Sequence, residues 1–439
     1  MSGFGSRLTY SKFGFVFKLC GLFRTMCDAP PPVSKEGDSK KRPLQEDSDN
    51  TDLKKQCVEP DRVKRRKVAL LFGYSGQGYL GMQRNPGMKT IEEDLLTALL
   101  KANFINEEAF STPQLIQFQR AARTDKGVSA VRQVVSLKLP EDVKVETINS
   151  HLPAQIRILE IKRTTKGFNS KSSCDARTYS YMLPTFAFAP SGVEPSESYR
   201  ITSEVMDNVR STLRGFEGTH NFHNFTSRKK PLDPSAIRYI INFELGEPFI
   251  SKGLEFAVLK VKGQSFMLHQ IRKMVGMTIA VARGLATIDT LHKAWKTERL
   301  DLPVAPGLGL VLEEVHYGRY NQRFGKDGIH EPLDWSETEA EAVAFKENFI
   351  YPTIIQSEIE DKSMMSWLET LHLHSYCIRE DNLSHGLETL GEAVDMIQGI
   401  DDGDRLATLA RVAQVVQEGQ NVMCNGNSNQ YPSEGVSSP

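Results

Sequence analysis

The sequence predicts an α+β protein made of two halves whose largely antiparallel sheets join, with flanking helices and a central basic cleft between the halves. Two observations lead to this fold class. Strand-like stretches occur in two successive runs along the chain, and apolar segments with helical spacing interrupt each run. The length of 439 residues is sufficient for one two-lobed body with appendages at both ends.

The first 67 residues have the composition of targeting and linker segments. Residues 1–27 are basic, acid-free and interleaved with Phe and Leu, which is typical of a mitochondrial presequence, and Lys18 argues against a secretory signal. Residues 28–67 are rich in Pro, Ser, Asp and Lys, so we expect disorder, and their basic runs indicate either nuclear import signals or solvated charge. We hypothesise that initiation at Met1 yields a mitochondrial product and initiation at Met26 a nuclear one.

The first half of the folded body is expected over residues 68–195. It opens with an apolar strand at Val68–Tyr74, followed by a helix over Thr90–Ala102 in which Thr90 and Glu93 form a capping box. The remaining elements of this half alternate in the same way; they are strands at 115–122, 134–139, 156–163 and 176–183 and a helix near 145–152.

The second half is expected over residues 196–356 and repeats this pattern, which predicts two ferredoxin-like or RRM-like halves. Residues 357–439 form an acidic tail that we expect to be partly helical, over 385–397 and 404–418, and partly disordered. The elements of the second half are helices around 203–216 and 267–283 and strands at 236–245, 254–261 and 308–317.

Charge is distributed unevenly along the chain. Residues 357–439 contain 4 Lys and Arg against 14 Asp and Glu, whereas residues 1–356 contain 50 against 41. A basic body is consistent with a nucleic-acid partner, and the acidic tail either weakens nonspecific binding to polyanions or is merely solvated. The six cysteines are scattered without zinc-ligand spacing, so we expect a reducing compartment and no metal. No apolar run approaches the length of a membrane span, and we expect no membrane partner.

The most informative single residue is Asp125, which lies between Arg123 and Lys126 just after a predicted strand. Neighbouring positive charge favours the ionised carboxylate. An ionised carboxylate beside cations suits a nucleophile that must meet a nucleic acid. Asp is also a favoured helix N-cap, and residues 128–130 could begin a helical turn, so this octapeptide alone favours a capping role.

The strand at 176–183 carries a second candidate group. Alternation places Arg177, Tyr179 and Tyr181 on one face of this strand. Tyrosines on such a face can stack on an extruded base, which is how proteins commonly bind unpaired RNA. The same pattern is typical of a half-buried strand, and for Tyr181 that interpretation is favoured.

Two further segments contain candidate site residues. The polar and aromatic loop at 218–225 includes Asn221 and is followed by a basic run. The apolar helix at 266–276 contains His269 and Arg272. A buried arginine needs an acidic partner, for which Asp125 is the candidate, although a surface arginine with a buried stem is the alternative.

A glycine motif at Gly76–Gly81 matches the dinucleotide fingerprint G-x-G-x-x-G, but residues 82–87 have the composition of a loop where that fingerprint requires a helix. We therefore reject an oxidoreductase. The glycines instead indicate a loop whose backbone approaches another group closely.

Five motifs follow one another in a fixed order. They are Tyr-x-Gly-x-x-Tyr-x-Gly-x-Gln at Tyr74–Gln83, Arg-Thr-Asp-Lys-Gly-Val at Arg123–Val128, Arg-x-Tyr-x-Tyr from Arg177 to Tyr181, the helix at Gly263–Gly276 and Ala-Pro-x-x-Gly-Leu-x-Leu at Ala305–Leu312. Together they resemble the TruA family of tRNA pseudouridine synthases over about Val68 to Tyr317. The longer matches are similar to the eukaryotic branch found in nucleus and mitochondria.

The resemblance implies an isomerase that converts uridine in tRNA to its C-glycoside. It implies that Asp125 either adds to C1′ or removes the 2′ proton and that Arg272 pairs with Asp125. It also implies that Tyr179 stacks on the uracil and can help the C5 proton to leave. Arg123 would fill the gap left by the flipped base and Lys126 would meet phosphate. Arg177, Asn221 and His269 complete the expected substrate contacts.

The resemblance also implies the partners. No cofactor or metal is expected, because the reaction changes no oxidation state. We expect tRNA and also messenger RNA as substrates, a monomer, and location in nucleus and mitochondrion. The alternative is a non-catalytic RNA-binding protein of related fold, although Lys166–Phe168 is only a fragment of the usual aromatic signature of such proteins.

Overall fold

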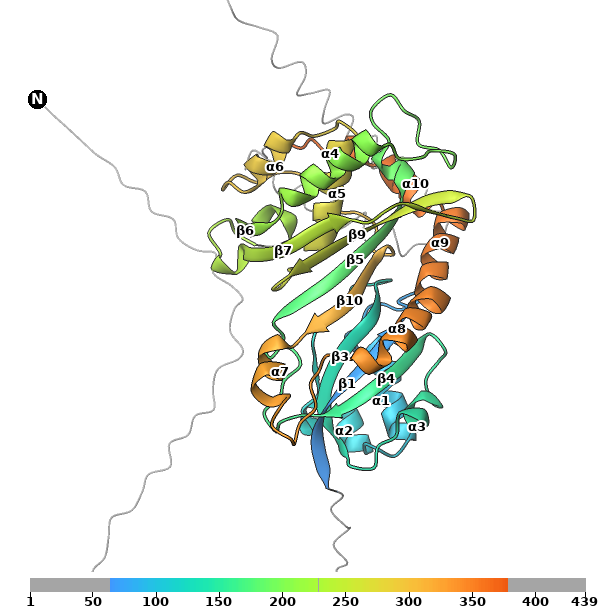
Figure 1. The fold of residues 1–439 in the computed structure, drawn as a ribbon, viewed down its shortest axis with the longest axis vertical. Coiled ribbons are helices and arrows are strands. Elements are labelled where there is room, and N and C mark those ends of the chain that lie inside the picture. Colours follow the sequence, from blue (N-terminus) through green and yellow to red (C-terminus); the bar gives the residue numbers. More distant parts are fainter. Residues whose placement is uncertain (1–63, 228, 378–439) are drawn as a thin grey trace, which may run out of the picture. The chain divides into compact units, whose positions relative to one another are not determined.

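The computed structural model describes residues 64–227 and 229–377. The predictions for residues 1–63 and for helices at 385–397 and 404–418 lie outside the described residues. The described part contains one ten-stranded sheet with helices packed on it (Figure 1).

The sheet joins the two halves in the order β4-β1-β3-β10-β5-β9-β7-β6, with β2 beside β3 and β8 beside β9. Every pairing is antiparallel except the parallel pair of β3 and β10. The predicted α+β fold with one largely antiparallel sheet is therefore confirmed, while the basic cleft stays a prediction. The strands are β1 (Arg65–Tyr74), β2 (Gln119–Arg120), β3 (Ser129–Pro140), β4 (Ile156–Arg163), β5 (Ala176–Pro184), β6 (Gly218–Asn221), β7 (Ile237–Leu245), β8 (Phe249–Ser251), β9 (Leu254–Gly263) and β10 (Leu310–His316).

Helices cover the sheet in both halves. The helix α3 packs against β4, and α4 packs against β7 and α5. The helix α5 is buried at nearly every position, as its almost unbroken apolar sequence requires. The helices are α1 (Ile91–Lys101), α2 (Glu107–Ser111), α3 (Val145–Asn149), α4 (Ser203–Arg214), α5 (Gln270–Ala282), α6 (Ile288–Ala294), α7 (Gly318–Phe324), α8 (Glu339–Phe345), α9 (Tyr351–Glu360) and α10 (Ser363–Leu368).

Several sequence-based assignments were wrong. The predicted capping box does not form, because the side chain of Thr90 makes no capping hydrogen bond to α1. The first part of the loop predicted at 218–225 is the strand β6. The strand predicted at 115–122 is mostly a 3-10 turn, Pro113–Ile116, that ends at Gln117 in the left-handed region, with only β2 left as a strand. Proline at the start of the turn favours this conformation. The helical turn predicted at 128–130 is instead the beginning of β3, because Ser129 and Ala130 pair with β10 and Ala130 also pairs with Tyr74.

The chain after β10 is more helical than the sequence suggested. The helix α8, a π-helical turn at Lys346–Ile350 and α9 follow one another without a break, and we call residues 339–360 the C-terminal strap. The strap packs against β1 and β3. The boundary placed between residues 356 and 357 falls inside α9, whose apolar face is buried.

None of the helices in the described part of the chain is both long and apolar enough to cross a membrane.

Candidate active site

Asp125 lies in an irregular loop, residues 121–128, that leads from β2 into β3; we call it the Asp125 loop. The backbone N–H of Met82 donates to the carbonyl of Thr124 over 3.1 Å. The hydroxyls of Tyr74 and Thr124 hydrogen-bond at 2.8 Å in a buried position. Two residues outside the loop therefore fix the backbone immediately before the carboxylate.

The glycine loop at 76–81 is the second support of the Asp125 loop. Gly81 has φ of 102°, a conformation that favours glycine, and a Cβ at this position would lie 2.9 Å from the carbonyl oxygen of Thr124. The N–H of Gly127 donates to the carbonyl of Tyr79 over 3.3 Å. The glycines thus allow close approach of two backbones, as the sequence predicted.

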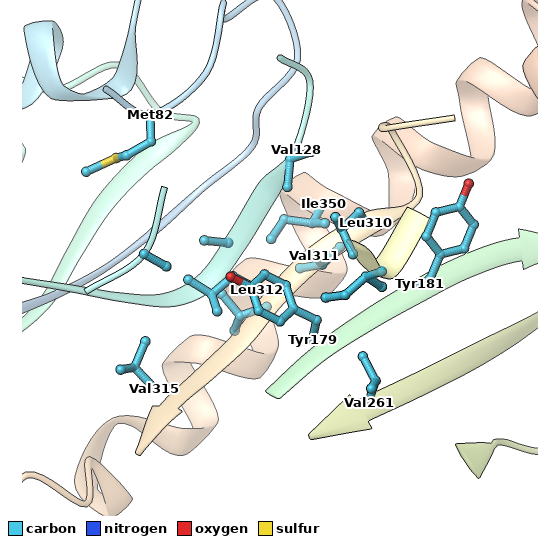
Figure 2. Packing of buried hydrophobic residues seen from close by; sticks show 14 of the residues in the cluster. Met82, Val128, Tyr179, Tyr181, Val261, Leu310, Val311, Leu312, Val315 and Ile350 are labelled. Atoms are coloured by element: carbon cyan, nitrogen blue, oxygen red, sulfur yellow. The ribbon is translucent and has the colours of Figure 1, made fainter. Parts of the chain in front are cut away.

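Tyr179 reaches the same region from β5. Leu312 of β10 pairs with Tyr179 on one side and with Ala130 of β3 on the other, so β10 connects the strand after Asp125 to the strand of Tyr179 (Figure 2). The Tyr179 ring is 7% exposed and contacts the edge of Phe266 at 5.3 Å between centroids. Its hydroxyl has no hydrogen-bond partner among residues 64–227 and 229–377.

Burial raises the pKa of Tyr179 above its usual range, and the negative charge of Asp125 adds to the rise although Arg177 opposes it. Tyr179 is therefore a neutral phenol at neutral pH.

Arg272 does not form the predicted ion pair with Asp125. Its buried guanidinium donates from Nε to the carbonyl of Ala305 over 2.6 Å. A Cβ placed on Gly307 would lie 3.9 Å from Cζ of Arg272 and 3.2 Å from the carbonyl oxygen of Lys126. The guanidinium thus lies close to Gly307, in the segment that contacts the Asp125 loop. Its acceptor is a backbone carbonyl of this segment and not the carboxylate of Asp125.

Among the ion pairs of the described residues, the carboxylate of Asp125 is paired with the imidazole of His269. Nε2 of His269 lies 3.8 Å from Oδ2 of Asp125, and the pair is charged only when the histidine is protonated. His269 precedes α5 with φ of 59°, in the left-handed region. This conformation is uncommon outside glycine and turns the chain directly before the helix.

The remaining predicted residues divide into exposed groups and tethered groups. Arg123 and Lys126 are exposed on either side of Asp125. Arg177 donates from Nη2 to the carbonyl of Ala121 over 2.7 Å and so ties β5 to the start of the Asp125 loop.

Asn221 is the last residue of β6, and its side chain hydrogen-bonds to the chain that follows the strand. Its Nδ2 donates to the carbonyl of Pro231 over 2.7 Å, and its Oδ1 accepts from the N–H of His223 over 3.3 Å. A substrate contact by Asn221 stays a prediction, and these hydrogen bonds hold the chain that follows β6.

The supporting residues Tyr74, Thr124 and Ala305 were not assigned roles from the sequence. All three lie inside or beside the five ordered motifs, but a backbone carbonyl or a buried hydroxyl partner has no signature of its own. No cluster of three or more His, Cys, Asp or Glu residues in the described part is arranged to hold a metal ion.

Comparison with known proteins gives one consistent result. Residues 213–318 match a family model described as tRNA pseudouridine synthase. The pseudouridylate synthase 1 homologs of Mus musculus and Homo sapiens are each 56% identical, over 72% and 70% of this chain and 76% and 74% of their own length. The tRNA pseudouridine synthase 1 of Kluyveromyces lactis is 33% identical over 76% of both chains.

Proposed function

Because the chain belongs to the TruA family of tRNA pseudouridine synthases and isomerises uridine to pseudouridine in tRNA, we propose that its active site is the Asp125 loop together with the facing parts of β5 and α5. One observation carries this assignment. The carboxylate of Asp125 lies 3.8 Å from His269 at the start of α5, and β10 pairs both with β3, which follows the Asp125 loop, and with β5 at Tyr179.

The reaction requires three events at one sugar. The bond between N1 of uracil and C1′ breaks, the uracil turns over, and C5 bonds to C1′ with loss of the C5 proton. An ionised carboxylate can add to C1′, as in retaining glycosidases, or remove the 2′ proton. We assign this step to Asp125 and leave both routes open.

Tyr179 contributes by contact with the base. Because burial raises the pKa of Tyr179, the phenol keeps its proton at neutral pH and can donate a hydrogen bond. Its neutral ring is also suited to stacking on the uracil. Its hydroxyl, which has no partner in the described part of the chain, is free for such a bond.

Arg272 has a positioning role in this proposal. By binding the carbonyl of Ala305 it holds the segment that contacts the backbone of Lys126.

The exposed cations beside Asp125 are assigned to the RNA. Enzymes that act on a base in a stack must extrude it, and Arg123 is placed to occupy the space that the base leaves. Lys126 is placed to contact phosphate, which orients the strand without reading its sequence.

We extend the proposal to the wider setting of the enzyme on the strength of its sequence. We propose messenger RNA as a second substrate class, a monomeric enzyme, and products in mitochondrion and nucleus that begin at Met1 and Met26. The acid-free composition of residues 1–27 and the basic runs of residues 28–67 support the two locations.

Release of tritium from C5-labelled uridine in tRNA tests the role of Asp125. We expect Asp125→Asn, which preserves the shape of the side chain, to abolish release while tRNA binding persists. Asp142→Asn, a change at an exposed aspartate after β3, is the matched control and should behave as wild type. Equal release by Asp125→Asn and wild type would contradict the catalytic assignment.

A further inference from the structure

A cavity of about 190 Å³ is lined in part by Arg120, the residue that directly precedes the Asp125 loop. A cavity of about 150 Å³ is large enough to enclose benzene, so this one can hold a single aromatic ring with its substituents. Its lining residues come from the segment after the glycine loop, from α1 and from the chain around β2; they are Gln83, Arg84, Glu92, Pro113, Gln114, Phe118 and Arg120. We call it the Gln83 pocket.

The Gln83 pocket is connected to the catalytic loop by the backbone. The N–H of Met82 donates to the carbonyl of Thr124, and Gln83 is the next residue. Arg120 directly precedes the Asp125 loop and pairs with Val135 of β3. Gln83 in the pocket lining therefore directly follows Met82, which hydrogen-bonds to Thr124, the residue before Asp125.

The walls of the pocket are held by buried polar contacts. Glu92 is 2% exposed. Its Oε1 accepts from Nη2 of Arg120 over 2.7 Å, and its Oε2 accepts from the N–H of Arg84 over 3.2 Å. The side chain of Arg84 lies over the Phe110 ring at 4.3 Å and pairs with Glu93. These contacts fix the lining before any ligand enters.

The chemistry of the lining excludes some ligands. Arg84 and Arg120 are each paired with a carboxylate, so their charges are already compensated and a phosphate gains little there. The amides of Gln83 and Gln114 each offer a donor and an acceptor. The buried Nε of Arg120 has no hydrogen-bond partner in the described part of the chain.

Phe118 adds an aromatic surface to this set, with the Arg120 guanidinium 5.8 Å from its centroid. Flat apolar surface combined with amide donors and acceptors is suited to a neutral heteroaromatic ring with a polar edge. We propose that the Gln83 pocket binds the nucleobase of a nucleotide beside the target uridine, so that the enzyme reads its substrate at two bases and not at one.

A cycle of protein and RNA changes tests this proposal, with a tRNA that the enzyme modifies at one mapped uridine. The base of each flanking nucleotide is removed in turn, and kcat/KM is measured by tritium release. Stacking of a base on an aromatic side chain contributes about 1–3 kcal/mol, and we expect removal of one flanking base to lower kcat/KM by about tenfold for wild type.

Gln83→Ala should also lower kcat/KM with the intact tRNA. With the abasic tRNA, the same substitution should lower kcat/KM little further. Gln114→Ala, at an exposed position, is the second variant and should show the same non-additivity without a folding defect. Gln119→Ala is the matched control, since Gln119 is exposed in the same segment and outside the pocket lining. Either of two results would overturn the proposal. In the first, removal of a flanking base on either side leaves kcat/KM unchanged. In the second, base removal lowers kcat/KM of both glutamine variants by the same factor as it does for wild type.

Discussion

At the scale of single residues, the backbone around Asp125 is fixed more firmly than its carboxylate. Thr124 is held by Met82 and Tyr74, while the carboxylate itself lies 3.8 Å from His269. This arrangement leaves the carboxylate oxygens accessible to a ribose. The sequence motifs single out Asp125, whose role stays a prediction. They also predicted an ion pair between Asp125 and Arg272, whereas Arg272 donates to the backbone carbonyl of Ala305.

Arg272→Lys separates the charge of this residue from its hydrogen bond. Lysine keeps the positive charge but cannot reproduce the bond from Nε to the carbonyl of Ala305. An unsatisfied buried carbonyl costs about 1–3 kcal/mol, and we expect that loss of stability together with a fall in kcat of about tenfold. Urea denaturation and single-turnover tritium release measure the two effects.

Arg200→Lys is the control for this variant. Arg200 also donates to backbone carbonyls, those of Tyr199 and Gly253, but it is exposed. Its replacement should leave kcat unchanged. A fully active Arg272→Lys enzyme at a temperature where it is folded would remove Arg272 from the positioning scheme.

At the scale of elements, the C-terminal strap contacts both parts of the sheet. Phe345 packs on Gly73 of β1, where an added Cβ would lie 2.9 Å from its ring. Lys346 binds Glu313 of β10, and Gln356 accepts from Lys252 beside β8. The strap therefore holds β1 and β10 in place on either side of β3.

The ion pair of Lys346 and Glu313 is the contact of the strap that is easiest to test. Nζ of Lys346 lies 2.8 Å from Oε1 of Glu313, which also accepts from Oγ of Ser180 over 2.5 Å. Both ionic side chains are mostly buried, at 20% and 14% exposure. Lys346→Met leaves a buried charge without a partner, and we expect a loss of about 3–5 kcal/mol in urea denaturation.

Adding Glu313→Gln to Lys346→Met should recover part of this loss, because the second change removes the unpaired charge. Glu247→Gln, which breaks the exposed pair with Arg210, should cost less than about 1 kcal/mol. A double variant less stable than Lys346→Met would show that the pair is not the source of the stabilisation.

At the scale of the whole molecule, the sequence predicted the sheet better than its surroundings. The strand at 156–163 matches β4, and those at 176–183 and 254–261 match most of β5 and β9, because their apolar patterns are regular. The strap was missed because its helical segments are short and a π-helical turn interrupts their 3.6-residue period.

The candidate site shows the same division. Motif order predicts roles for Asp125 and Tyr179, and the strand pairing through β10 that links their segments could not be predicted from the motifs. The partners of Arg272 and Thr124 could not be predicted, because carbonyls and hydroxyls are brought to them by packing of distant segments.

Glu358 makes the stability of the whole molecule dependent on pH. Burial raises the pKa of Glu358 from 4.5 to about 7, the hydrogen bond from the N–H of Met364 opposes the rise, and the charge of Asp361 adds to it. The folded state thus binds more protons than the unfolded chain between these values, and stability falls as pH rises through them. The full change corresponds to about 3 kcal/mol.

Thermal melting between pH 4.5 and 8 measures this effect. Glu358→Gln should be more stable relative to wild type at pH 8 than at pH 5, because the amide carries no charge to bury. Glu360→Gln, at an exposed position of the same helix, should run parallel to wild type. A difference between Glu358→Gln and wild type that does not vary with pH would contradict this assignment.

The parallel ladder between β3 and β10 consists of only two residue pairs, Ser129 with Val311 and Ala130 with Leu312. Asp125 precedes one end of this junction, and Tyr179 pairs with the other side of Leu312. These four paired residues thus set the separation between the segments that carry Asp125 and Tyr179, although none of the four is assigned a contact with the ribose or the uracil. Tolerance to substitution should consequently be lower at these four positions than at many exposed positions nearer to the RNA.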